Sequence, residues 1–157
     1  MIIERNKFHQ SCFKHEYKGL SVDGEYFEMR FYLIIVDNEF AMIESLEENK
    51  NYINKENLKR LFDAYDQMSR VEKINDLNFC NCRYTYKNNI IEIKLFDTER
   101  LGNEDIDNPT VYQSWRGEYL NNSFYLTLYS TTLDYQLEEY QETSSPIIKK
   151  AKFTRIY

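Results

Sequence analysis

The second half of the chain alternates apolar and polar residues in runs that pairs of asparagine separate. In chain order the runs and their turns are 79–87, Asn88-Asn89, 90–96, 111–120, Asn121-Asn122 and 123–133. Asparagine adopts positive φ more readily than most residues, so an asparagine pair between β-rich runs is typical of a tight hairpin. The pattern predicts two antiparallel hairpins in an up-and-down β architecture.

The first half contains the longest alternating run, at 25–36. One face of this predicted strand is apolar: Phe27, Met29, Phe31, Leu33 and Ile35. The opposite face is more polar: Tyr26, Glu28, Arg30 and Tyr32. The turn dipeptides Asp23-Gly24 and Asp37-Asn38 bound this run, with a short strand expected at 17–22 and a partner strand at 39–46. A last strand at 147–157 is expected to close the sheet.

The periodicity becomes helical after Glu47. Asn54 can cap a helix over 54–68, because its apolar residues recur at the spacing of one helix face. These residues are Leu58, Leu61, Phe62, Tyr65 and Met68. In the segment 1–16, Phe8, Cys12 and Phe13 have helical spacing, which indicates a short helix or lid. Residues 69–78 are interpreted as a link, and 97–110 as an acidic loop.

These elements predict a mainly β fold with seven or eight strands and one amphipathic helix, in a single domain over 1–157. That number of strands suits a small antiparallel up-and-down barrel, which side chains fill or which holds one ligand. A sandwich of two sheets has the same hairpin periodicity and stays an alternative. The helix could cover the mouth of a barrel or pack on its outside.

The run Glu25-Tyr26-Phe27-Glu28-Met29-Arg30-Phe31-Tyr32, with its turn and second strand, resembles the opening of small lipocalin-like (calycin) bacterial domains. Two later segments, Arg83 to Leu95 and Trp115 to Leu128, resemble the hairpins that follow in those domains. The resemblance covers about residues 24–157 and is one of pattern. It implies a lipocalin-like β-barrel shape and transfers no binding residue to this chain.

Composition narrows the class of protein. The 157 residues include 14 Tyr, 10 Phe and 1 Trp, and such aromatic content suits strands and leaves hydroxyl groups that need partners. The formal net charge of −6 argues against a nucleic-acid partner, because such partners favour clustered Lys and Arg. We expect no membrane span, since no run of about 20 apolar residues occurs. Three cysteines, too few for a disulfide framework, favour a cytoplasmic location.

Candidate catalytic and metal-binding residues are few. His9, Cys12 and His15 are spaced three apart and contain zinc-ligand types, and Cys80-x-Cys82 could complete a ligand set, although no spacing rule joins the two groups. Solvated histidines and small core cysteines are the better interpretation. The acidic segment 97–107 resembles a calcium loop but places Leu101 and Asn108 where ligands are required. We expect no catalytic residue, no metal and no cofactor.

The candidate ligand-binding residues are aromatic or cationic. Four arginines lie within aromatic strands: Arg30, Arg83, Arg116 and Arg155. Facing a cavity, they could hold a carboxylate or phosphate. On an outer face, Glu28 and Glu118 would pair with Arg30 and Arg116, which is the better interpretation. Trp115 and Gly117 share a strand face that could line a cavity mouth. The better interpretation is that Trp115 fills the core and Gly117 allows the close approach of a neighbouring group. The candidate set is Arg30, Tyr32, Tyr84, Tyr86, Trp115 and Arg116.

The sequence favours a non-catalytic barrel that binds a small hydrophobic or anionic molecule. The alternative is an acidic protein-interaction module, such as an immunity or adaptor protein with a basic partner, because the chain is acidic and rich in tyrosine.

Overall fold

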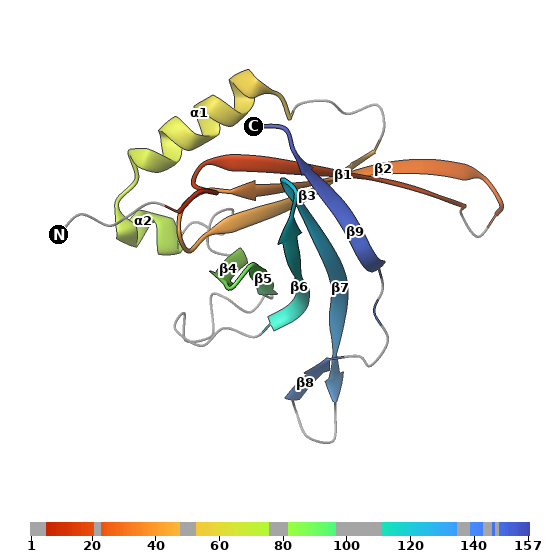
Figure 1. Cartoon of the computed structure of the whole chain (residues 1–157). Coiled ribbons are helices and arrows are strands. Elements are labelled where there is room, and N and C mark those ends of the chain that lie inside the picture. Colours follow the sequence, from red (N-terminus) through yellow and green to blue (C-terminus); the bar gives the residue numbers. More distant parts are fainter. Residues whose placement is uncertain are drawn as a thin grey trace.

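A computed structural model describes residues 6–20, 23–47, 53–75, 82–96, 111–134, 139–142, 146 and 148–157. Within these ranges the chain forms nine strands and two helices (Figure 1). The strands are β1 Ser11–Leu20, β2 Tyr26–Ile35, β3 Ala41–Glu47, β4 Cys82–Lys87, β5 Ile90–Phe96, β6 Val111–Leu120, β7 Ser123–Asp134, β8 Glu139–Glu142 and β9 Ile148–Arg155. The helices are α1 Lys55–Asp66 and α2 Arg70–Asn75. Cys80 and the predicted acidic loop lie outside the described residues.

Eight of the strands form a nearly closed antiparallel barrel. The hydrogen-bonded order is β3-β2-β1-β9-β7-β6-β5-β4. Outside this order, β8 pairs with the last four residues of β7, Thr131 to Asp134. At the remaining seam, β3 and β4 meet through the bridge between Phe40 and Arg83 and a 2.9 Å bond from Tyr84 N–H to the Glu39 carbonyl. Apart from β8, neighbours around the barrel follow chain order. The predicted up-and-down β barrel is therefore confirmed.

Both asparagine pairs form the predicted tight hairpins. Asn88 and Asn89 have φ of 53° and 63°, and Asn121 and Asn122 have φ of 51° and 62°. Two successive residues with positive φ define the turn whose twist matches that of the flanking strands. The side chain of the second asparagine accepts a bond from the tyrosine three residues earlier, at 3.0 Å from Tyr86 and at 3.2 Å from Tyr119. The recurring unit is thus Tyr-x-Asn-Asn.

The prediction of a short helix within 1–16 is wrong for the described residues 6–16. Residues 7–10 form a turn, and β1 begins at Ser11 and pairs with β2 along its whole length. Phe13 faces the barrel interior, whereas Cys12 packs beneath α1, so the first residues of β1 are buried on both faces. Burial on both faces removes the alternation that identifies a half-buried strand.

The predicted helix is present as α1. The Asn54 side chain accepts a 2.9 Å bond from the Asn57 N–H, which caps the helix as expected. The interpretation of 69–78 as a link missed α2. Ser69 and Glu72 exchange side-chain to backbone bonds of 3.2 and 3.1 Å, a capping box that the sequence Ser-x-x-Glu encodes.

Two apolar clusters hold the elements together. The larger one lies inside the barrel and includes Leu33, Ile93, Trp115, Leu126 and Phe153. The smaller one lies between α1 and the outer face of β1–β3, with α1 outside the barrel in Figure 1. It consists of Cys12, Tyr32, Ile34, Val36, Phe40, Leu58, Phe62 and Tyr65. Of the two positions expected for the helix, the outside one is observed.

Candidate functional site

One end of the barrel interior is closed by the segment before β1. The Phe8 ring lies among aromatic side chains of β4, β6 and β7, with centroids 4.8 Å from Tyr86, 4.9 Å from Tyr119 and 4.9 Å from Phe124. Lys7 Nζ lies 4.4 Å from the centroid of the Tyr119 ring, a cation–π contact. Rings therefore fill this end of the barrel.

Burial decreases toward the opposite end. Ile93, Trp115 and Leu128 form a buried layer. Two positions nearer this end on the same strands lie Leu95, Gln113 and Ser130, which are only half-buried. Three further half-buried apolar side chains pack against the same interior cluster: Phe31, Ile43 and Ile148. These six half-buried side chains form a mainly apolar rim at this end of the interior, above the buried layer.

Trp115 lies in that buried layer with an unmatched polar group. Its side chain is 1% exposed and contacts the rings of Phe31 and Phe153, with centroids 5.8 and 5.5 Å away. The indole Nε1–H has no hydrogen-bond acceptor among the described residues. A buried donor without an acceptor costs about 1–3 kcal/mol, so it calls for an explanation.

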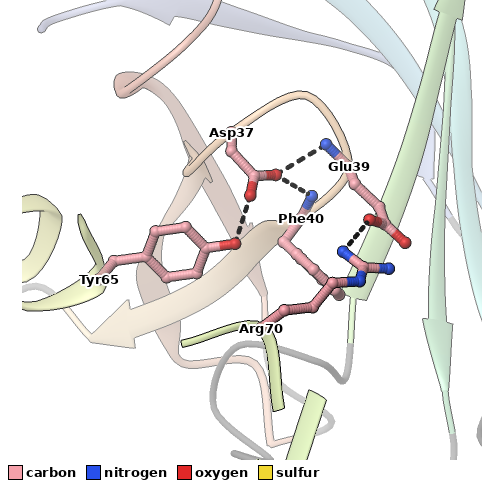
Figure 2. A network of polar contacts seen from close by, with 5 residues as sticks. All are labelled: Asp37, Glu39, Phe40, Tyr65 and Arg70. Atoms are coloured by element: carbon pink, nitrogen blue, oxygen red, sulfur yellow. Dashed lines mark hydrogen bonds and ion pairs between the residues drawn. The ribbon is translucent and has the colours of Figure 1, made fainter. Parts of the chain in front are cut away.

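A network of hydrogen bonds and an ion pair lies at the seam between β3 and β4 (Figure 2). Asp37 Oδ1 accepts bonds of 2.7 Å from the N–H groups of Glu39 and Phe40. Asp37 Oδ2 accepts from the Tyr65 hydroxyl of α1, and Arg70 Nη1 donates to Glu39 Oε2 over 3.1 Å. The β2–β3 turn is thereby tied to both helices.

Tyr84 extends this network into β4. Its hydroxyl donates to the Asp37 carbonyl and accepts a 2.9 Å bond from Asn6 Nδ2. Burial raises the pKa of Tyr84 to about 12, and burial together with the Asp37 hydrogen bond raises the pKa of Tyr65 above its ordinary range. Both phenols therefore stay protonated at neutral pH, and their bonds hold the seam together.

The six candidate ligand-binding residues do not form one group. Tyr84, Tyr86 and Trp115 point into the interior, at the seam, the closed end and the layer below the rim respectively. Tyr32 is on the outer face of β2, buried beneath α1. Arg30 and Arg116 also lie on outer faces, because the inward positions of their strands belong to the interior cluster.

Arg30 has neighbours other than the one expected. Glu28 pairs with Lys18 of β1 at 3.3 Å, and Arg30 lies across from Glu16. The pKa of Glu16 is lowered chiefly by its bond to Lys14, with a smaller contribution from Arg30. Arg155 donates to the Lys7 carbonyl over 3.2 Å at the closed end. Surface placement of Arg30 is therefore confirmed, but its predicted partner is wrong.

The spacing of His9, Cys12 and His15 does not produce a shared site. Because β1 is a strand, Cys12 points toward α1, whereas His15 lies near Phe153 and contacts the Lys152 carbonyl at 2.9 Å. Among the described residues no cluster of three His, Cys, Asp or Glu side chains is placed to hold a metal. Burial raises the pKa of Cys12 to about 12. Burial also raises the pKa of Cys82 above its ordinary value, so neither thiol is an activated nucleophile.

Sequence reasoning missed the Asp37–Tyr65–Tyr84 network. The sequence predicts a turn at Asp37 and places Tyr65 on the apolar face of a helix, and both predictions are confirmed. Their contact joins residues 28 positions apart, and the contact to Tyr84 joins residues 47 positions apart. The turn-forming Asp37 was the available signal, since such side chains bond to the backbone two or three residues later.

None of the described helices is long and apolar enough to cross a membrane. Comparisons with protein-family models, curated protein sequences and solved structures found no match to this chain.

Proposed function

We propose that the protein is a non-catalytic binding protein that takes a small, partly apolar molecule into the rimmed end of its barrel. The observation that carries this proposal is the Trp115 Nε1–H, a buried donor with no acceptor among the described residues. An acceptor atom on a bound molecule would satisfy it. The interior of an eight-stranded barrel has room for side chains or for one small ligand, so the proposed ligand is a small molecule.

Two features favour a partly apolar ligand. Half-buried side chains that pack against the interior cluster offer apolar contact: Phe31, Ile43, Leu95 and Ile148. Gln113 and Ser130 lie on the same inner face and supply polar atoms for orientation. Binding sites commonly combine a mostly apolar lining with a few placed polar groups. The lipocalin-like resemblance and the cytoplasmic location stay predictions that agree with this proposal.

The chain contains one tryptophan, so its fluorescence reports on this site. We expect 1-anilinonaphthalene-8-sulfonate, an apolar anionic dye, to quench the Trp115 emission saturably with one dye per chain. Native mass spectrometry of purified protein against its denatured mass would detect a molecule that copurifies. If the dye causes no saturable quenching and no added mass is found, the proposal fails.

A matched pair of variants locates the dye. Leu95→Trp narrows the rim from the inner face of β5, and we expect it to weaken dye binding at least tenfold when the dye is excited directly. Ile90→Trp adds the same side chain on the outer face of β5, where Ile90 is 46% exposed. Equal weakening by both variants would place the dye elsewhere and contradict the proposal.

The protein-interaction module stays an alternative prediction. Its acidic loop at 97–107 lies outside the described residues, so its support is the net charge of −6 and exposed tyrosine such as Tyr26.

A further inference from the structure

A groove of about 410 Å³ lies on the outside of the barrel, across β6, β7 and β9. β6 lines it with Arg116, Gly117 and Glu118, and the other two strands line it with Tyr125, Thr127 and Lys150. These strands lie next to one another in Figure 1. Trp115 points to the inner face of β6 and Arg116 to its outer face, so the groove is separate from the barrel interior.

The groove coincides with local departures from regular strand geometry. At Gly117 the backbone of β7 approaches so closely that a Cβ atom would lie 1.7 Å from the Tyr125 carbonyl oxygen. The pairing of β7 with β9 shifts register between Leu126 and Leu128. Opposite this shift, Lys150 has φ of 48° and donates its N–H to Thr127 Oγ1 over 3.1 Å.

Such departures cost free energy and redirect side chains. A residue other than glycine in the left-handed region costs about 1–2 kcal/mol, and such residues concentrate at binding sites. Bulges in strands re-aim the side chains next to them. Here the irregular backbone brings Lys150 of β9 to the same groove as Arg116 of β6.

Arg116 and Lys150 give the groove two cationic side chains in a chain with net charge −6. The Arg116 guanidinium lies 4.3 Å from the centroid of the Tyr129 ring, which restricts the orientation of its donors. A planar guanidinium matches the paired oxygens of a carboxylate or phosphate, and a lysine adds a point charge. Glu118 is the single acidic side chain of the lining and can accept from a ligand hydroxyl.

We propose that this groove is an anion-binding site for a small organic phosphate or carboxylate, with Arg116 and Lys150 holding the anionic group. The volume is within the range of small-molecule sites, about 300–1,000 Å³. Tyr125 and the exposed Leu120 border the groove and contact the organic part of the ligand. The site does not depend on a ligand in the barrel interior.

The test is a titration of the ¹⁵N-labelled full chain with phenyl phosphate and, separately, with benzoate. We expect at least one of them to shift the amide signals of Gly117, Thr127 and Lys150 saturably, and the stronger binder identifies the anionic group. Sodium chloride at matched ionic strength should not reproduce the shifts. Absence of saturation with both compounds, or equal shifts with chloride, would overturn the proposal.

Variants separate a built site from general attraction to positive charge. Lys150→Gln should weaken binding about tenfold, the usual scale for one bond to a charged group. Lys149→Gln removes the same charge from the neighbouring exposed residue, which does not line the groove, and should leave binding unchanged. Arg116→Lys keeps the positive charge but loses the paired donors of the planar guanidinium, so it should also weaken binding. Equal effects of Lys149→Gln and Lys150→Gln would overturn the proposal.

Discussion

At the scale of single residues, Gly117 is the position where the barrel wall has least space. A Cβ atom there would lie 1.7 Å from Tyr125 O, 2.7 Å from Tyr125 C and 3.0 Å from Leu126 Cα, all backbone atoms of β7. Backbone atoms cannot rotate away as a flexible side chain can. A methyl group at this position therefore requires β6 and β7 to move apart.

We expect Gly117→Ala to lower the free energy of unfolding by about 2 kcal/mol or more, as overpacking of a close contact does. Urea unfolding followed by the emission of Trp115 measures this loss. Gly24→Asn is the control, because Gly24 has φ of 78° with no atom near its Cβ position, and asparagine adopts such φ readily. A loss at Gly117 no larger than that at Gly24 would contradict the steric explanation.

The sequence indicated part of this. A glycine inside the predicted strand at 111–120 pointed to a close approach, and that prediction is confirmed. The identity of the approaching group depends on the pairing of Gly117 with Leu126, which pattern alone does not specify. Likewise, Arg116 was identifiable as a candidate, but its neighbour Lys150 comes from a strand that is not adjacent in sequence.

At the scale of elements, the two Tyr-x-Asn-Asn hairpins have the same construction. Each places two asparagines at positive φ, and the second asparagine accepts a bond from the preceding tyrosine. The first asparagine of each pair therefore contributes chiefly through its tolerance of the left-handed conformation.

We expect Asn121→Ala to lower the free energy of unfolding by about 1 kcal/mol, because alanine is disfavoured at φ of 51°. Asn121→Gly should cause little or no loss, since glycine adopts this conformation without strain. Thermal and urea unfolding of the two variants give the comparison. Equal losses would indicate that the Asn121 side chain, rather than its backbone conformation, stabilises the hairpin.

Elements with one buried face were predictable, and elements with other patterns were not. The strand at 25–36, the helix and both hairpins carry a clear period, and all are present. Ser11, Cys12 and Phe13 are all buried because α1 covers the outer face of β1, so their pattern resembled a helix. β8 was missed because Glu139–Glu142 is a short strand with mostly polar residues.

At the scale of the whole molecule, buried ionisable groups link stability to pH. Burial raises the pKa of Cys12 and of Tyr84 to about 12, and it raises the pKa of Cys82 and Tyr65 as well. The unfolded chain releases these protons at the ordinary values of 9.0 for the thiols and 10.0 for the phenols. Above those values the folded state retains protons that the unfolded state has lost.

The free energy of unfolding should therefore be constant near neutral pH and fall as the pH rises above 9. Each group contributes about 1.4 kcal/mol per pH unit between its unfolded and folded pKa. Urea unfolding at pH 8, 9, 10 and 10.5 measures the slope. Tyr84→Phe should reduce the slope above pH 10, whereas Tyr26→Phe, at a side chain 78% exposed, should not. Equal slopes in the two variants would contradict the assignment to Tyr84.

The pairing of β1 with β9 has a consequence for the order in which the molecule can be assembled. Phe13 lies opposite Arg155, and His15 contacts Lys152, a residue 137 positions later in the chain. During synthesis on the ribosome, β1 and β7 both keep an open edge until β9 has emerged and inserted between them. Contacts so distant in sequence slow folding, and open strand edges favour pairing with other chains. Before β9 inserts, most of the aromatic side chains of the barrel interior are already present but not yet enclosed, so this is the stage at which we expect pairing with other chains to be most favourable.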